Sequence, residues 1–106
     1  MSLTGMHIVC APTASTDSGG VLPLITGFFG KTMTAAAIVG QVPGAAKALL
    51  RAHSSVQGFI AVSKVSGADA LAKAQDANAV RWIVEADSQD HDYYVEAGNY
   101  VAWAPA

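Results

Sequence analysis

The pattern of apolar residues predicts β-strands near the start and the middle of the chain. Residues 56–65 give the clearest strand, and both of its faces are partly apolar. Such a strand is typical of the interior of a sheet that is covered on both sides. Gly58 within it indicates a bulge or a close approach by another backbone segment. A shorter strand is predicted at residues 7–10, ended by Pro12.

Two segments carry helical signals. Residues 43–53 begin with proline, which suits the first turn of a helix, and repeat apolar residues at spacings of three and four. Ser66 followed by Asp69 is typical of a helix N-terminus, so a second helix is predicted over residues 68–77. Asn78 is expected to close that helix in the left-handed conformation.

The longest apolar run, residues 21–39, is ambiguous between helix and strand. Alanines near its centre favour a helix, whereas Thr34, Ile38 and Val39 favour a strand, and we expect a helix followed by a strand. The run is also almost long enough to cross a bilayer, but the charge of Lys31 within it disfavours a membrane span.

The last third of the chain alternates regularly and predicts an antiparallel meander, with strands at residues 80–86, 93–96 and 100–104. Side-chain parity divides its larger residues into a group facing the core and a group facing outward. The core group is Trp82, Tyr93, Val95, Val101 and Trp103, and the outer group is Tyr94, Tyr100, Arg81 and Glu96.

Together these elements predict a mixed α+β fold. The expected architecture is one small domain with a mixed sheet of about five strands, two or three short helices and the C-terminal antiparallel meander, and a layered α/β arrangement is the alternative. The domain is expected to span residues 6–106, because the second methionine, Met6, offers a native start after an added leader at residues 1–5.

The composition favours association between copies of the chain. The 106 residues are 52% hydrophobic and only 13% charged, about half the usual share of charged residues. A surface so poor in charge is expected to be partly buried against other subunits. The net charge of −2 gives no general attraction to nucleic acid or to anionic lipid, so neither is expected as a partner.

The charges are distributed unevenly along the chain. Up to Lys64 there are four basic residues and one acid, whereas the rest of the chain holds two basic residues and seven acids. Opposite charges on different faces would favour association at low salt, and the alternative is that folding interleaves them. The single cysteine, Cys10, excludes an internal disulfide and fits a reducing compartment, so a cytoplasmic location is expected.

Two motif-like strings do not meet the requirements of the chemistry that they suggest. Gly30-Lys31-Thr32 suggests a phosphate-binding loop, but Ile25 stands where the pattern needs a glycine. Cys10 before a loop suggests a thiolate phosphatase, but Thr16 stands where an arginine would hold the phosphate. Neither activity is expected.

The loop at residues 13–20 is nevertheless a candidate ligand site. Its serines, threonines and glycines could bind an anion through hydroxyls and backbone N–H groups, with the Gly-Lys-Thr string as a further contact. The candidate ligand-binding residues are Thr13, Ser15, Ser18, Gly19, Gly20, Lys31 and Thr32.

No metal, cofactor or catalytic site is expected. The acidic segment at residues 87–92 contains three aspartates and His91, but their spacing does not match a calcium-binding loop, so it is interpreted as a solvated turn. His7 and His91 are too isolated to be proposed as a pair, and no catalytic constellation can be assembled.

The leading hypothesis from the sequence is a non-catalytic, homo-oligomeric assembly or protein-interaction module. Aromatic residues on an outer face are typical interface anchors, so the candidate interface residues are Tyr94, Tyr100 and Arg81. The alternative is a protein that binds a small anionic metabolite, or a small enzyme, using the loop at residues 13–20.

Overall fold

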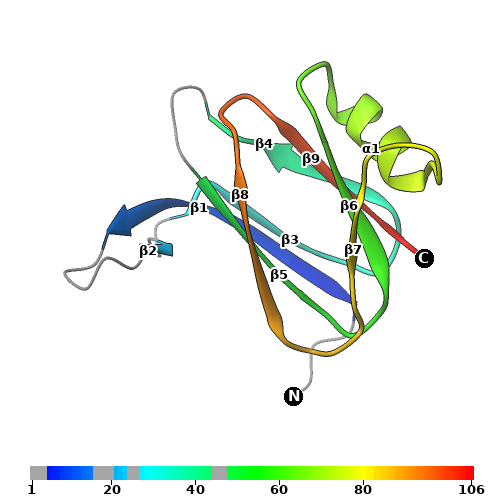
Figure 1. Ribbon diagram of the computed structural model, residues 1–106, viewed down its shortest axis with the longest axis horizontal. Helices are drawn as coiled ribbons and strands as arrows, with labels where there is room; N and C mark the ends of the chain where they lie inside the picture. The colour runs from blue at the N-terminus through cyan, green and yellow to red at the C-terminus, as the bar shows by residue number, and fades with distance from the viewer. Residues whose placement is uncertain (1–4, 16–20, 24–26, 44–47) are drawn as a thin grey trace.

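The computed structural model describes residues 5–15, 21–23, 27–43 and 48–106. These residues form nine strands and one helix, arranged as two antiparallel sheets that face each other (Figure 1). The fold is mostly β, so the predicted α+β fold with two or three helices is wrong. The layered α/β alternative is wrong as well, because every strand pair in the described part of the chain is antiparallel.

The first sheet is built around β1 (Met6–Ser15). Strand β5 (Ala48–Ser54) pairs with one edge of β1, and β3 (Phe29–Met33) pairs with the other. Strand β8 (Asp90–Val95) extends the sheet beyond β5. The short strand β2 (Val21–Pro23) pairs with the last three residues of β1.

The second sheet has the strand order β4, β9, β6, β7. These strands are Ala37–Gln41, Tyr100–Pro105, Gly58–Ser63 and Trp82–Val84 respectively. The helix α1 (Gly67–Gln75) lies across the outer face of this sheet, where it contacts β6, β9 and β4 (Figure 1). The radius of gyration of 13.3 Å is that of a compact chain of this length.

The two sheets differ in how many of their faces are covered, and their sequences reflect this. In the second sheet, Ile60 and Trp103 face the first sheet while Ala61 and Ala104 pack against the helix, so neighbouring residues that point to opposite faces are both buried. This confirms that residues 56–65 contain an interior strand covered on both sides. The outer face of the first sheet is open, and its residues therefore alternate between buried and partly exposed, as they do along residues 6–10.

The N-terminus of α1 confirms the predicted capping. The hydroxyl of Ser66 accepts a hydrogen bond of 3.0 Å from the backbone N–H of Asp69, which satisfies one of the free donors of the first turn. The carboxylate of Asp69 also accepts from the Ser63 hydroxyl and lies 3.3 Å from Lys73 Nζ. The predicted end is wrong, because the helix stops at Gln75 with an extended residue after it and Asn78 is not left-handed.

The helix predicted over residues 43–53 is wrong, because residues 48–54 form β5. Its apolar residues satisfy a helical period, but Leu50, Ala52 and Ser54 also satisfy a period of two and fill the core opposite the second sheet. Pairing with β1 on one side and β8 on the other stabilises the strand. Residues 44–47 of the predicted helix lie outside the described residues.

The run at residues 21–39 contains strands β2, β3 and the start of β4, so the helix expected there is wrong in its described part. Residues 24–26 lie outside that part. Strand β1 also continues through Pro12, because its pairing with β5 stops at that residue and its pairing with β2 begins at the next. A residue without an N–H group is tolerated where one ladder gives way to another.

The predicted C-terminal meander is wrong in its connections. Strands β7 and β9 belong to the second sheet, whereas β8 between them belongs to the first, so the chain crosses the sandwich twice. Hydrophobic alternation locates such strands but does not say which sheet each one joins. No helix in the described part of the chain is long and apolar enough to cross a membrane.

Trp103 is the largest side chain in the core that is fully buried. It lies over Gly58 on the neighbouring strand, where a Cβ atom would approach the indole Nε1 to 2.4 Å and the Ala104 carbonyl oxygen to 2.7 Å. Gly58 is therefore a point of close approach, as its position in a strand indicated. The indole N–H finds no hydrogen-bond partner among the described residues.

Replacing Gly58 with alanine is expected to lower the free energy of unfolding by about 1–3 kcal/mol, because the added methyl group overpacks the contact with Trp103. Urea denaturation measures the change. Gly30→Ala on β3 is the matched control, since its Cβ would meet its nearest neighbour at 3.5 Å, an ordinary contact. Equal stability of the two variants would contradict the predicted strain.

Candidate functional site

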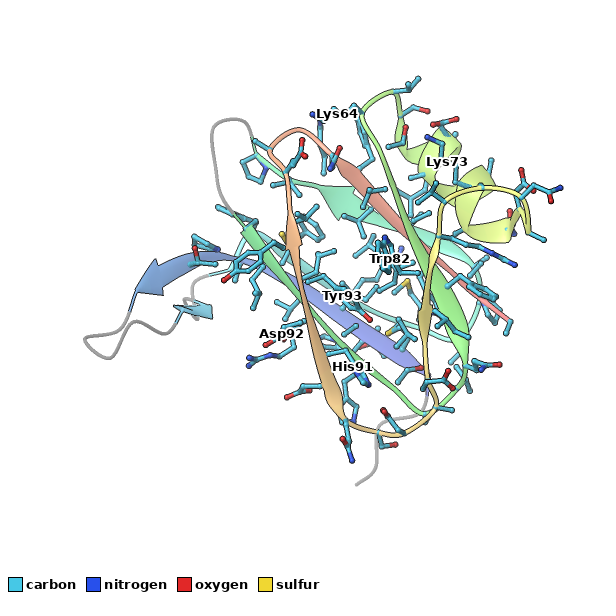
Figure 2. All side chains as sticks on the ribbon, viewed as in Figure 1. Lys64, Lys73, Trp82, His91, Asp92 and Tyr93 are labelled. Carbon is cyan, nitrogen blue, oxygen red and sulfur yellow. The ribbon has the colours of Figure 1, made fainter. Side chains whose placement is uncertain are left out.

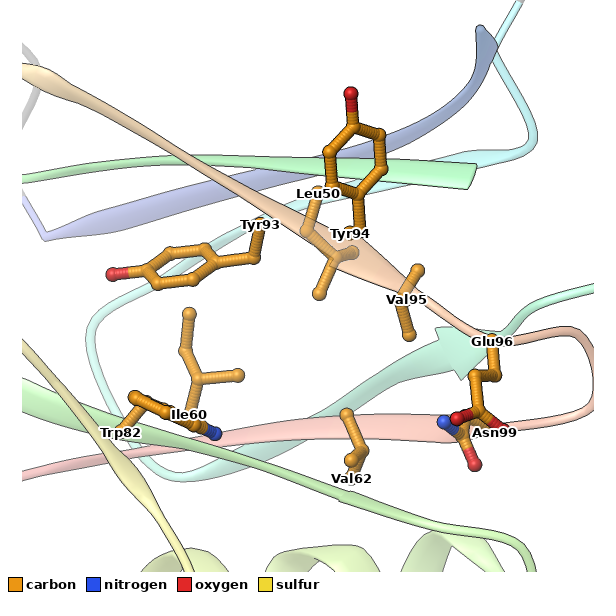
Figure 3. Close-up of a pocket in the computed structure, with 9 residues that line it drawn as sticks. All are labelled: Leu50, Ile60, Val62, Trp82, Tyr93, Tyr94, Val95, Glu96 and Asn99. Carbon is orange, nitrogen blue, oxygen red and sulfur yellow. The ribbon is translucent and has the colours of Figure 1, made fainter. Parts of the chain in front are cut away.

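The two sheets leave a pocket between their end strands β7 and β8. Its volume is about 300 Å³, and its floor is apolar, formed by Leu50, Ile60 and Val62 (Figure 3). Trp82 and Tyr93 stand at its sides, on the inner sides of β7 and β8, while Asp92 lies on the other side of β8 (Figure 2). The open edge of the sandwich thus offers an aromatic-walled cavity.

Trp82 belongs to this pocket and not to the core. It pairs with Ile60 and faces the same side of the sheet, as parity predicted, but 61% of its surface is exposed. The reason is its position on an end strand, where the first sheet does not extend far enough to cover it. Tyr93 is half-buried against Ile60, and burial raises the pKa of its hydroxyl, with a smaller effect from the charge of Asp87.

The far end of the pocket is polar. Asn99, which is 92% buried, lines the pocket there with its side-chain amide, and the carboxylate of Glu96 lies at the same end (Figure 3). Lys64 lies 2.7 Å from the Glu96 carboxylate, and its hydrogen bond lowers the pKa of that group. An apolar floor with a carboxylate at one end suits an apolar group better than an anion.

The edge strand β7 and the residues just before it expose more apolar surface near the pocket. The exposed fractions are 80% for Val80 and 48% for Ile83, in addition to Trp82. Within the described residues β7 pairs only with β6, so its other edge presents free backbone donors and acceptors. Exposed apolar side chains on an unpaired edge are typical of a surface that binds another chain.

Two opposite charges flank β7. The Arg81 guanidinium lies 3.5 Å from the centre of the Phe59 ring and donates a hydrogen bond to the Ala74 carbonyl oxygen. At the other end of the strand, the Glu85 carboxylate accepts a hydrogen bond of 3.1 Å from the Gln57 amide. The sequence from residue 81 to residue 85 is thus basic, then apolar, then acidic.

The outer face of the first sheet carries two rows of polar side chains that cross its strands. In one row, Arg51 donates two hydrogen bonds, of 2.8 and 2.9 Å, to the carboxylate of Asp92 on β8. The Asp92 pKa is lowered by this contact. The neighbouring row consists of Thr32, His7, His53 and Asp90, one from each of the four strands β3, β1, β5 and β8.

The charges of the two halves of the chain meet in the folded structure. Arg51 and Lys64 from the first half contact Asp92 and Glu96 from the second. Folding therefore interleaves these charges, which was the alternative to two oppositely charged faces.

The predicted ligand-binding residues are not brought together where they are described. Lys31 and Thr32 lie on opposite faces of β3, with Lys31 Nζ 3.4 Å from the Ile38 carbonyl oxygen and Thr32 against His7. The Gly-Lys-Thr string is part of a strand, so it does not precede a helix as a phosphate-binding loop would. Thr13 and Ser15 belong to β1, and Ser18, Gly19 and Gly20 lie outside the described residues.

The predicted interface residues lie on different surfaces. Tyr94 is 71% exposed on the first sheet, and its ring points away from the pocket (Figure 3). Tyr100 is half-buried on the outer side of the second sheet, and Arg81 lies near the helix. Parity placed both tyrosines facing outward, but it could not indicate that they belong to opposite faces of a sandwich.

The three aspartates of the acidic segment at residues 87–92 each pair with a histidine or an arginine. Asp87 lies 2.8 Å from His91 Nε2, while Asp90 and Asp92 contact His53 and Arg51. Across the described ranges, no group of three or more His, Cys, Asp or Glu side chains is arranged to hold a metal ion. Burial raises the pKa of the Cys10 thiol to about 11, so this cysteine is an inert core residue.

The cross-strand pair of His7 and His53 is the feature that the sequence did not reveal. The two residues are 46 positions apart, and only the pairing of β1 with β5 places them opposite each other. The charge pattern around β7, in contrast, can be read directly from residues 81–85.

Comparison with known proteins does not add to this description. No protein-family model, no curated protein and no solved structure matches the chain.

The ion pairs predict that the protein loses stability in acid. Asp92 and Glu96 have a lowered pKa in the folded state because of Arg51 and Lys64, and Asp69 because of Ser63 and Lys73. Each therefore contributes stability that is complete above the ordinary carboxyl pKa of about 4 and is lost as the pH falls through the lowered value. Thermal unfolding between pH 7 and pH 2 measures this decline.

The variant Asp92→Asn tests the contact that is made by two hydrogen bonds. It should lower the melting temperature at pH 7 and make the decline in acid shallower, because the contact with Arg51 no longer titrates. Asp76→Asn, at an exposed position after the helix, is the control. An unchanged acid profile in Asp92→Asn would show that this pair does not stabilise the fold.

Proposed function

We propose that this chain is a non-catalytic assembly module that pairs with a second copy of itself through the edge strand β7. The observation that carries the proposal is the self-complementary sequence of this edge, where Arg81 and Glu85 flank three apolar residues. The free edge and the exposed apolar surface beside it support the same pairing.

Antiparallel pairing of two identical strands has two-fold symmetry, so each residue meets a fixed partner. If the axis passes Ile83, Trp82 of one copy lies opposite Val84 of the other. Arg81 then lies opposite Glu85 of the second copy, and symmetry produces this pair twice. Opposite charges on facing residues stabilise antiparallel strands, so the charge pattern favours this register over a shifted one.

Pairing would also cover apolar surface that the single chain leaves exposed. Trp82 is 61% and Ile83 48% exposed, and they lie on opposite faces of β7. A strand added at this edge would cover part of both side chains and would partly close the mouth of the pocket between β7 and β8. A tryptophan at the centre of a contact is a typical interface anchor.

The small share of charged residues supports the same proposal, because two copies of the chain repel each other only weakly. The lone, buried cysteine supports assembly in a reducing compartment such as the cytoplasm. No group in the described part of the chain needs to act as a catalyst in this role.

The charge pattern gives a direct test. Arg81→Glu and Glu85→Arg each convert two attractive contacts into two repulsive ones, so each variant should dimerise about tenfold more weakly or worse. Light scattering after size exclusion should give twice the monomer mass of 10.8 kDa for the original protein and a lower value for each variant. Raising the salt concentration should weaken the original dimer.

Two controls separate pairing from local damage. An equal mixture of the two single variants, and the double variant with both changes, should each restore the dimer, although the contact of Arg81 with Phe59 stays lost in the double variant. Asp76→Arg makes the same charge change as Glu85→Arg, but away from β7, and should leave the dimer intact. A monomeric original protein, or single variants that dimerise normally, would rule out the proposal.

A further inference from the structure

Two histidines on the outer face of the first sheet lie directly opposite each other. His7 on β1 and His53 on β5 are register partners, so their Cβ atoms are about 4.5–5.5 Å apart. Both side chains are partly exposed, with 33% for that of His53. Two imidazoles at this separation are close enough to bind one ion.

Contacts on either side of the pair orient both rings. His7 Nδ1 lies 2.8 Å from Thr32 Oγ1 on β3, and His53 Nδ1 lies 3.1 Å from Asp90 Oδ1 on β8. These two strands lie on opposite sides of the pair. In an imidazole ring Nε2 points outward from the sheet and leans away from the side of Nδ1, so rings held by Thr32 and Asp90 on their outer sides can bring both Nε2 atoms towards the space between β1 and β5.

The same contacts leave the Nε2 atoms able to accept a ligand bond. The carboxylate of Asp90 only accepts hydrogen bonds, so His53 donates from Nδ1 and its neutral ring keeps a lone pair on Nε2. The Thr32 hydroxyl can accept from His7 Nδ1 in the same way. A carboxylate or other oxygen on the far nitrogen is the usual arrangement around a metal-binding histidine.

We propose that His7 and His53 bind one divalent late transition-metal ion, such as Ni²⁺, Cu²⁺ or Zn²⁺, through their Nε2 atoms. Imidazole is a preferred ligand of these ions, and water would complete the coordination. The nearest cation on this face, Arg51, is neutralised by its two hydrogen bonds to Asp92. The described residues supply no third protein ligand, so the site is open and the bound ion exchangeable. The sequence alone predicted no metal site, and metal binding by these two histidines does not require the proposed dimer.

The test is thermal unfolding of the untagged protein with and without NiCl₂. A saturating concentration of Ni²⁺ should raise the melting temperature by about 4 °C or more, and EDTA should reverse the shift. Isothermal titration should give one ion per chain. The variants His7→Gln and His53→Gln should each lose the shift, because one imidazole alone binds too weakly.

The third histidine provides a matched control. His91 lies on a different strand, β8, and its Nε2 contacts Asp87 instead of the His7–His53 pair. The variant His91→Gln should therefore keep the full shift in melting temperature. Each variant is compared with its own metal-free melting temperature, so a change in stability alone does not imitate a loss of binding. Retention of the shift in His7→Gln or His53→Gln, its loss in His91→Gln, or one ion bound per two chains would overturn the proposal.

Discussion

The contact between Trp103 and Gly58 sets the arrangement of the sandwich. The indole occupies the centre of the core, and it can lie there only because the neighbouring strand has no side chain at position 58. The same contact leaves the indole N–H without a partner in the described structure, which costs about 1–3 kcal/mol. The apolar area of the ring offsets that cost, so shape complementarity outweighs hydrogen bonding at this position.

The difference between the two sheets decides where function can be located. The second sheet is covered by the helix on one face and by the first sheet on the other, so the residues of its interior strands are not free to bind a ligand or partner. The first sheet keeps an open face, on which polar side chains of neighbouring strands form hydrogen-bonded pairs. The end strands β7 and β8 add the second available surface. An assembly contact at the edge and a metal site on the face would not compete, because they use different strands and different side chains.

Features encoded within a few neighbouring residues could be predicted from the sequence. The cap formed by Ser66 and Asp69 and the doubly covered strand at residues 56–65 are of this kind. The helix expected over residues 43–53 failed because its apolar residues fit both periods, and pairing with β1, some 40 residues earlier, decided between them. The same limit applies to the candidate sites. The exposure of Trp82 depends on how far the opposite sheet extends, and the pairing of His7 with His53 depends on a register between distant strands.

The strand order has a consequence for how the chain reaches this structure. Strand β9 is the last in sequence, yet it lies inside the second sheet, between β4 and β6, and carries Trp103. During synthesis β4 and β6 must therefore wait for β9 with their inner edges unpaired, and the core cannot close before it arrives. Folding of this chain depends on contacts between distant segments, so we expect folding to be slow for a chain of this size. Until β9 pairs, the unpaired edges of β4 and β6 are open to aggregation with other molecules.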